Sequence, residues 1–288
     1  MEPPHRQRRV QGHRAHHGLI LSAQRPVGVF DSGVGGLSIL QALRAELPHE
    51  HYVYVADSGH APYGERDPAH VIARSLAITR HLVDQHAIKL LVVACNTATA
   101  AAIHLLREQW PQLPIVGVEP ALKPAAQQTR TQRVGVLATR GTLESAKFRT
   151  LLAGLQGEVA FMLQACDGLA DAIERQDDAA IEALCTRYVQ ALAPYGTQPG
   201  QIDALVLGCT HYPFARDRLQ ARAGEAVALI DSGAPVARQT RRLLEGGPGL
   251  VPEGSGHVVF HATGYAERLQ TAAASWLQLD AHVDRLAV

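Results

Sequence analysis

Short apolar runs alternate with longer segments of helical periodicity along this chain of 288 residues. Residues 27–30, 89–94 and 202–207 have the short apolar pattern of buried strands, and residues 68–86 have the periodicity of a helix. Strands that alternate with helices in this way favour a parallel sheet built from βαβ units. Because both halves of the chain repeat the pattern, we expect an α/β protein with two similar lobes. Each lobe would be a mostly parallel sheet flanked by helices, with a functional site in the cleft between the lobes.

Composition excludes several classes of protein. Apolar residues make up 47% of the chain and charged residues 19%, the ordinary balance of a globular protein. The formal net charge of zero argues against a nucleic-acid partner. No apolar run reaches the roughly 18 residues that a membrane helix needs. The four cysteines lack the spacing of a small disulfide framework and form no CxxC pair, so we expect reduced thiols in a cytoplasmic protein.

Residues 1–25 differ in composition from the rest of the chain. This segment is rich in arginine and histidine and lacks the apolar core of about 7–15 residues that a signal peptide would need. His13, His16 and His17 could hold a metal ion, but a segment without a packing pattern is more typical of a disordered extension.

Two of the predicted strands end on a cysteine that small polar residues follow. One runs into Cys95-Asn96-Thr97 and the other into Cys209-Thr210-His211. Ligands of α/β proteins bind at the carboxyl ends of strands, and a helix N-terminus next to Cys95 would lower the pKa of its thiol from about 8.5 toward neutrality. Two thiols facing one pocket would suit chemistry that needs proton carriers on opposite faces of one carbon. The alternative is that both cysteines are buried packing residues, which is favoured for Cys166 and Cys185 in their helical surroundings.

Two further loops follow predicted strands. The glycine-rich turn at residues 31–36 lacks the lysine of a P-loop, and Asp31 would repel a phosphate. We therefore interpret Asp31 as an acid–base helper or a partner for an ammonium group, and Ser32 as a donor to the ligand. The loop at residues 57–66 places the rigid Pro62 and the flexible Gly64 around Tyr63, which suits a segment that covers a ligand. An ordinary turn is the alternative there.

Together, the turn at residues 31–37, the Pro62-Tyr63-Gly64 sequence and the two cysteine motifs resemble the glutamate racemases, the cofactor-independent branch of the aspartate/glutamate racemase superfamily. The resemblance runs from about residue 26 to the last predicted helix. It implies an enzyme that interconverts L- and D-glutamate and supplies D-glutamate for peptidoglycan, with no pyridoxal phosphate, no metal and no other cofactor. It also implies an active site between a discontinuous lobe 1, residues 26–118 and 232–288, and lobe 2, residues 119–231.

The resemblance assigns roles to individual residues. Cys95, with Asp31 beside it, would act on D-glutamate, and Cys209, with His211 beside it, would act on L-glutamate. Glu174 matches a further catalytic carboxylate, although the family often has a proline after the cysteine that corresponds to Cys166, where this chain has Asp167. The expected substrate contacts are Asp31, Ser32, Tyr63, Gly64, Asn96, Thr97, Thr139, Thr142, Thr210 and His211. A homodimer is expected, and some relatives bind a cell-wall precursor as an activator.

Other functions remain open on the residues alone. A pyridoxal phosphate racemase needs a Schiff-base lysine, but Lys89, Lys123 and Lys147 all lie outside the motifs. A cysteine hydrolase with Cys209 as nucleophile and His211 as base would leave the other cysteine motif unexplained. A two-lobed amino-acid-binding protein would bind glutamate without exchanging its α-proton. An aspartate racemase differs by one methylene of substrate length, a matter of about 1–3 kcal/mol.

Overall fold

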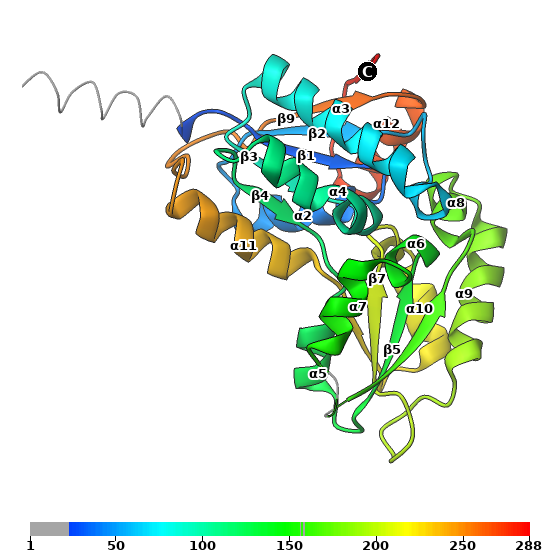
Figure 1. Cartoon of the computed structure of the whole chain (residues 1–288). Helices are drawn as coiled ribbons and strands as arrows, with labels where there is room; N and C mark the ends of the chain where they lie inside the picture. The colour runs from blue at the N-terminus through cyan, green and yellow to red at the C-terminus, as the bar shows by residue number, and fades with distance from the viewer. Residues whose placement is uncertain (1–22, 156, 158) are drawn as a thin grey trace, which may run out of the picture.

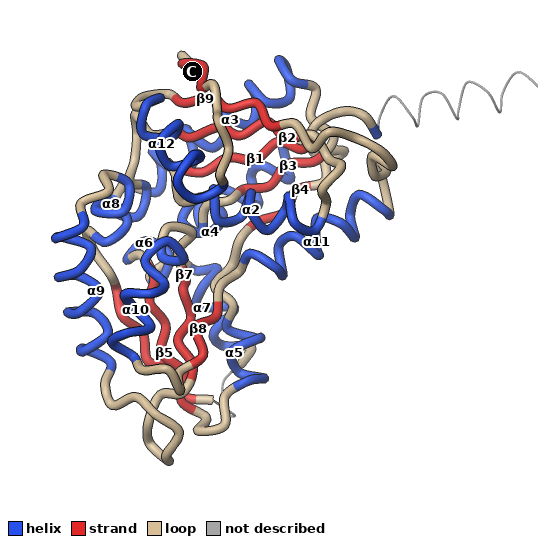
Figure 2. Tube along the Cα trace, turned by 180° about the vertical axis from the view of Figure 1, so that it is seen from behind, coloured by secondary structure: helices blue, strands red, loops and turns tan. Residues whose placement is uncertain are grey.

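The computed structural model describes residues 23–155, 157 and 159–288. His13, His16 and His17, for which metal binding was considered, lie outside the described residues, as does most of the expected N-terminal extension. Figure 1 shows the two groups of strands in separate halves of the molecule, and Figure 2 shows the same division from behind. The predicted α/β architecture of two mostly parallel sheets flanked by helices is confirmed.

The first lobe is built on a six-stranded sheet within the described part of the chain. The strand order is β10-β9-β2-β1-β3-β4, and every adjacent pair is parallel. The strands are β1 (Val27–Asp31), β2 (Tyr52–Ala56), β3 (Leu90–Val93), β4 (Ile115–Gly117), β9 (Val258–Ala262) and β10 (Val283–Arg285). A central parallel sheet is covered on both faces, which explains why β1 and β2 are buried along their whole length.

The two faces of this sheet have separate cores because successive side chains of a strand point to opposite faces. In β2, Tyr52 and Tyr54 pack on one face, whereas Val53 and Val55 pack on the other. The helices of the first face are α2 (Leu37–Glu46), α11 (Gly233–Glu245) and α12 (Ala266–Leu277). The helices of the second face are α3 (Pro68–His86) and α4 (Asn96–Gln109).

The second lobe is built on a four-stranded sheet among the described residues. Its order is β6-β5-β7-β8, again with parallel pairs. The strands are β5 (Arg133–Ala138), β6 (Ala160–Ala165), β7 (Ala204–Gly208) and β8 (Ala228–Ile230). One face is covered by α5 (Leu122–Gln128) and α7 (Ala146–Ala153). The other is covered by α8 (Leu169–Glu174), α9 (Asp178–Leu192) and α10 (Arg216–Ala223).

The chain passes between the sheets twice, after β4 and after β8. Helix α11 follows β8 and packs on α2 of the first lobe, and β9 then pairs with β2. The last elements of the chain therefore belong to the first sheet. This path brings the carboxyl ends of β1, β3 and β7 toward one another.

Some elements differ from the predicted ones. The helical pattern of residues 143–155 predicts one helix, whereas the structure has two in this region, α6 (Arg140–Leu143) and α7, because Thr139 and Ser145 each cap a helix start with the side-chain oxygen. Helices α5 and α10 and strand β10 were not predicted. Helix α10 opens with Arg216-Asp217-Arg218, and β10 has three residues, so neither has a clear apolar pattern. In the described part of the chain, no helix combines the length and apolar character needed to cross a membrane.

Candidate active site

The two cysteine motifs of the sequence meet between the lobes. Cys95 follows β3 and is the N-cap of α4, where its Sγ accepts a hydrogen bond from the Ala98 N–H at 3.4 Å. Cys209 follows β7 of the second lobe. Cys95 and Cys209 are 5% and 7% exposed, and Cys209 lies close enough to Cys95 to raise the pKa of the Cys95 thiol. The structure therefore places two buried thiols, one from each lobe, at a common site.

The environment of Cys95 differs from the expected one. Burial raises the pKa of the Cys95 thiol well above its usual value, and the nearby Asp31 carboxyl adds to this effect. The N–H groups of Ala98 and Ser32 act in the opposite direction but are outweighed. The lowering of the pKa that the helix N-terminus predicts is therefore outweighed by burial, which favours the neutral thiol in this conformation.

Cys209 is the start of a chain of polar contacts that runs through His211 to Glu174. The Cys209 Sγ and His211 Nδ1 atoms are 3.8 Å apart, and His211 Nε2 lies 2.9 Å from Glu174 Oε2. Burial by itself would lower the pKa of His211, but the contacts with Cys209 and Glu174 and the charge of Asp31 raise that pKa well above its usual value. His211 is therefore held as an imidazolium beside the Cys209 sulfur.

The glycine-rich turn of the first lobe lies directly against this pair. The Val34 N–H donates to Glu174 Oε2 at 2.8 Å. A Cβ atom on Gly33 would lie 2.2 Å from Glu174 Oε2, and one on Gly35 would lie 2.1 Å from His211 Nδ1. The glycines thus permit a close approach of the two lobes, a function that the sequence did not reveal.

Asp31 lies at the end of β1 and is fully buried. Its Oδ2 accepts hydrogen bonds from the N–H groups of Gly33 at 3.2 Å and Gly36 at 2.9 Å. Its Oδ1 is buried with no hydrogen-bond partner among the described residues. Burial raises the pKa of this carboxyl despite the opposing charge of His211. A buried carboxyl with a free oxygen is suited to hold a proton, or to accept a hydrogen bond from a ligand's ammonium group.

Three of the predicted contacts form a hydroxyl cluster across the cleft. Thr97, in the first turn of α4, has its Oγ1 3.0 Å from Thr139 Oγ1, which in turn donates to Thr142 Oγ1 at 2.9 Å. Asn96 Nδ2 donates to the Val118 carbonyl at 3.4 Å. The resemblance had assigned these residues to one ligand, and the structure brings the three threonines together.

Tyr63 does not direct its hydroxyl into the cleft. It begins the short helix η1 (Tyr63–Glu65), its side chain is 1% exposed, and its hydroxyl donates to Asp57. A ligand contact at Tyr63 must therefore come from the main chain. Gly64 lies against the second lobe, where an added Cβ would be 2.8 Å from the Thr139 Cβ.

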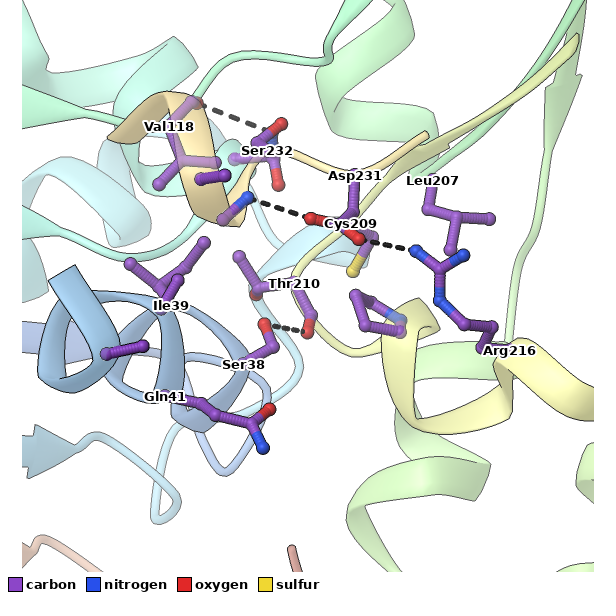
Figure 3. A pocket seen from close by; sticks show the side chains of 16 residues that line it. Ser38, Ile39, Gln41, Val118, Leu207, Cys209, Thr210, Arg216, Asp231 and Ser232 are labelled. Carbon is purple, nitrogen blue, oxygen red and sulfur yellow. Dashed lines mark hydrogen bonds and ion pairs between the residues drawn. The ribbon is translucent and has the colours of Figure 1, made fainter. Parts of the chain in front are cut away.

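A cavity of about 370 Å³ lies beside Cys209, between the lobes (Figure 3). Asn96 and Thr210 also line it, and Ser38 donates a hydrogen bond to the Thr210 carbonyl at 2.8 Å. The cavity is also lined by Gln41, Arg216, Asp231 and Ser232, which are not among the predicted site residues. The repetition of Asp-Ser-Gly at residues 31–33, 57–59 and 231–233 was a signal that could have found the last two. Within the described residues, no group of three or more His, Cys, Asp or Glu side chains could hold a metal ion.

Comparisons with known proteins identify the family of this chain. The family model of the Asp/Glu/Hydantoin racemases matches residues 37–240. The glutamate racemase of Ectopseudomonas mendocina is 54% identical over 227 residues, which are 77% of this chain and 83% of the relative. The glutamate racemase of Ralstonia pickettii is 48% identical over 258 residues, 88% and 89% of the two chains.

Similar solved structures are also glutamate racemases. The Escherichia coli glutamate racemase in complex with L-glutamate and the activator UDP-MurNAc-Ala matches with a TM-score of 0.79 and 34% identity, over 92% of this chain and 99% of the other. The isoform RacE1 of Bacillus anthracis matches with a TM-score of 0.81 and 30% identity, over 92% and 98%. The family model and these relatives thus identify the chain as an amino-acid racemase of the Asp/Glu/Hydantoin racemase family. Within that family, the chain belongs to the glutamate racemases.

Proposed function

We propose that this protein interconverts L- and D-glutamate without a cofactor, by proton transfer between the substrate and two cysteines on opposite faces of the α-carbon. The observation that carries the proposal is the pair of buried thiols at the ends of β3 and β7, one from each lobe. Each thiol has its own acid–base neighbour, Asp31 for Cys95 and His211 for Cys209.

With L-glutamate bound, the Cys209 thiolate removes the α-proton while the Cys95 thiol donates a proton to the opposite face. The C–H bond breaks toward Cys209, the electron pair stays on the α-carbon, and the S–H bond of Cys95 supplies the new hydrogen. The raised pKa of Cys95 suits this direction because it keeps Cys95 protonated. The His211 imidazolium stabilises the anionic sulfur of Cys209, and the reverse reaction exchanges the roles of the two cysteines.

The substrate would be held by the polar groups that line the cleft. Asp31 Oδ1 has no partner among the described residues and is suited to the α-ammonium group. Carboxylate groups would be bound by hydroxyl, amide and main-chain donors from both lobes, namely Ser32, Tyr63, Gly64, Asn96, Thr97, Thr139, Thr142, Thr210 and His211. Exclusion of water from this site strengthens these interactions and stabilises the developing carbanion. The D-glutamate formed would serve peptidoglycan synthesis in the cytoplasm.

The test is incubation of the pure protein with L-glutamate in D₂O, with optical rotation and α-deuterium followed together. We expect rotation to disappear and deuterium to appear at the α-carbon, while aspartate in a parallel sample changes far more slowly. Faster racemisation of aspartate than of glutamate would instead indicate an aspartate racemase. Binding of glutamate without deuterium incorporation, with and without a cell-wall precursor, would overturn the catalytic proposal and leave a binding protein.

Two partners are also proposed. The Escherichia coli relative was solved with UDP-MurNAc-Ala as activator, so we propose that a cell-wall precursor of this class activates the present protein and that the protein forms a homodimer. An increase of kcat on addition of UDP-MurNAc-Ala, and a dimer mass in sedimentation velocity, are the expected results. An unchanged kcat would reject the activator, and a monomer mass would reject the homodimer.

A further inference from the structure

Asp57 joins three elements of the first lobe beneath the segment that covers the cleft. It follows β2 and is fully buried. The Tyr63 hydroxyl donates to its Oδ2 at 2.5 Å, and the Thr263 hydroxyl, from the turn after β9, donates to its Oδ1 at 2.7 Å. Arg74 of α3 donates to both oxygens, from Nε and Nη2, at 2.9 Å each. The Asp57 carboxylate is thus held by groups from three separate elements.

Arg74 supplies the charge that keeps this carboxylate ionised. Burial by itself would raise the pKa of Asp57, but the bonds from Arg74, Tyr63 and Thr263 lower that pKa overall. The Arg74 side chain is only 12% exposed, and its Nη1 also donates to the Val288 carbonyl at 2.8 Å. Because the Arg74 guanidinium donates to Asp57 with two nitrogens and to Val288 with the third, it holds the Asp57 carboxylate in one orientation.

The segment above Asp57 reaches across to the second lobe. The Gly64 carbonyl lies 3.1 Å from where a Cβ on Gly141 would stand, and Glu65 Oε1 accepts a hydrogen bond from the Gly168 N–H at 3.0 Å. Because the Tyr63 hydroxyl is bound to Asp57, the main chain of Tyr63 and Gly64 is the part of this segment left to face a ligand. The position of this main chain therefore depends on the hydrogen bond between the side chains of Tyr63 and Asp57.

We propose that Arg74 is a positioning residue for substrate binding, which acts through Asp57 and Tyr63 to fix the Tyr63-Gly64 main chain at the cleft. The inference rests on the proposed racemase function and deepens it. Arg74 touches neither thiol in the contacts described, so its loss should weaken the binding of both glutamate enantiomers and should affect proton transfer much less. The expected signature is therefore a change in KM rather than in kcat.

The experiment compares Arg74→Met, Arg74→Lys and Tyr63→Phe with Arg80→Met, a control on the same helix at an exposed position. For Arg74→Met we expect KM to rise about tenfold for both enantiomers and kcat to change less than about threefold. Arg74→Lys should restore part of the affinity, because one charged donor returns without the bidentate geometry. Tyr63→Phe should raise KM in the same sense and leaves the Asp57–Arg74 pair intact. The control should match the wild type.

Circular dichroism and thermal unfolding verify that each variant is folded at the assay temperature. An unchanged KM in folded Arg74→Met and Tyr63→Phe, or a loss confined to kcat, would overturn the proposal. If the wild type does not racemise glutamate, the proposed function fails, and calorimetric titration with D-glutamate still decides the role of Arg74. In that case, the role of Arg74 would be rejected if the wild type and folded Arg74→Met bound D-glutamate with equal affinity, or if the wild type did not bind it.

Discussion

The side chains around Cys209 in the second lobe are held in place partly by contacts with the first lobe. Glu174 lies at the end of α8, its Oε2 contacts both His211 Nε2 and the Val34 N–H, and Val34 belongs to the first lobe. The imidazole is therefore oriented by a carboxylate that is itself oriented across the cleft. A carboxylate in this position fixes the tautomer and raises the basicity of a histidine.

Replacement of either cysteine by serine should nearly abolish racemisation, because a serine hydroxyl is a far weaker acid and base than a thiol. We expect kcat in both directions to fall by at least about 10³-fold for Cys95→Ser and for Cys209→Ser, with little change in thermal stability. Circular dichroism spectropolarimetry of the glutamate signal measures the rate. Cys185→Ser, at a buried cysteine outside the site, is the matched control. Turnover near the wild-type rate in either site variant would exclude the two-base mechanism.

Glu174→Gln should shift the pH dependence of the reaction. Glu174 is one of the groups that raise the pKa of His211, so its neutralisation lowers that pKa and the imidazolium loses its proton at a lower pH. We therefore expect the alkaline limb of kcat for L-glutamate to move to lower pH, by about one unit, with kcat reduced at its maximum. Glu144→Gln, at an exposed glutamate of the same lobe, should leave the profile unchanged. A profile that keeps its alkaline limb in Glu174→Gln would contradict this assignment.

Among the elements, α3 and β9 carry a cluster of imidazoles away from the active site. The rings of His81, His86 and His261 have centroids 5.0–6.0 Å apart. The Nε2 atoms of His81 and His261 are buried with no hydrogen-bond partner among the described residues. Burial lowers the pKa of all three, and among the described residues this effect is opposed by the charge of Asp84 at His81 and of Asp284 at His261.

This cluster predicts a loss of stability on mild acidification. The folded-state pKa values are lowered, so above the unfolded pKa of about 6.5 both states are neutral and the cluster has no effect. Below that pH the unfolded chain binds more protons than the folded protein, and the free energy of unfolding decreases. We expect the urea midpoint to fall between about pH 7.5 and pH 5.5, and His261→Gln to reduce this fall. An equal fall in His261→Gln and in the exposed control His104→Gln would contradict the prediction.

The helices and strands differ in how well the sequence predicts them. The strands were predictable because parallel strands covered on both faces are short and apolar throughout, as in β1, β3 and β7. The candidate active-site turns after them could be found because each follows such a strand directly. Helix α10 could not, because its first turn is charged. The pairing of Glu174 with Val34, 140 positions apart, depends on how the lobes approach each other, and no local pattern encodes that.

For the molecule as a whole, the two lobes are held together at more than one place. The Thr97–Thr139 hydroxyl pair lies across the cleft. Elsewhere, Trp276 of α12 stacks on Phe214 of η2 (Tyr212–Ala215), with centroids 3.6 Å apart and ring planes 12° apart. Because η2 directly follows His211, this stack links the first lobe to the turn that carries Cys209.

Trp276→Ala should therefore affect both stability and catalysis. Loss of the stack should lower the free energy of unfolding by about 1–3 kcal/mol, and kcat should fall because the Cys209–His211 turn loses its contact with the first lobe. Urea unfolding and the racemisation assay measure the two effects. Trp110→Ala, a tryptophan that packs within the first lobe alone, should lose stability and keep its kcat. A Trp276→Ala enzyme with wild-type kcat would show that the stack is structural only.

The burial of both thiols has a kinetic consequence under the two-base mechanism. Each conversion of L- to D-glutamate leaves Cys209 protonated and Cys95 deprotonated, so the enzyme that releases product is poised for the reverse reaction. Because Cys95 and Cys209 are only 5% and 7% exposed, their sulfurs exchange protons with water slowly, and the other way back to the starting protonation is the reverse reaction. After release of D-glutamate, the free enzyme therefore stays for a time in the protonation state that reacts with D-glutamate. At saturating substrate this reset, rather than the breaking of the C–H bond, would set the ceiling on turnover.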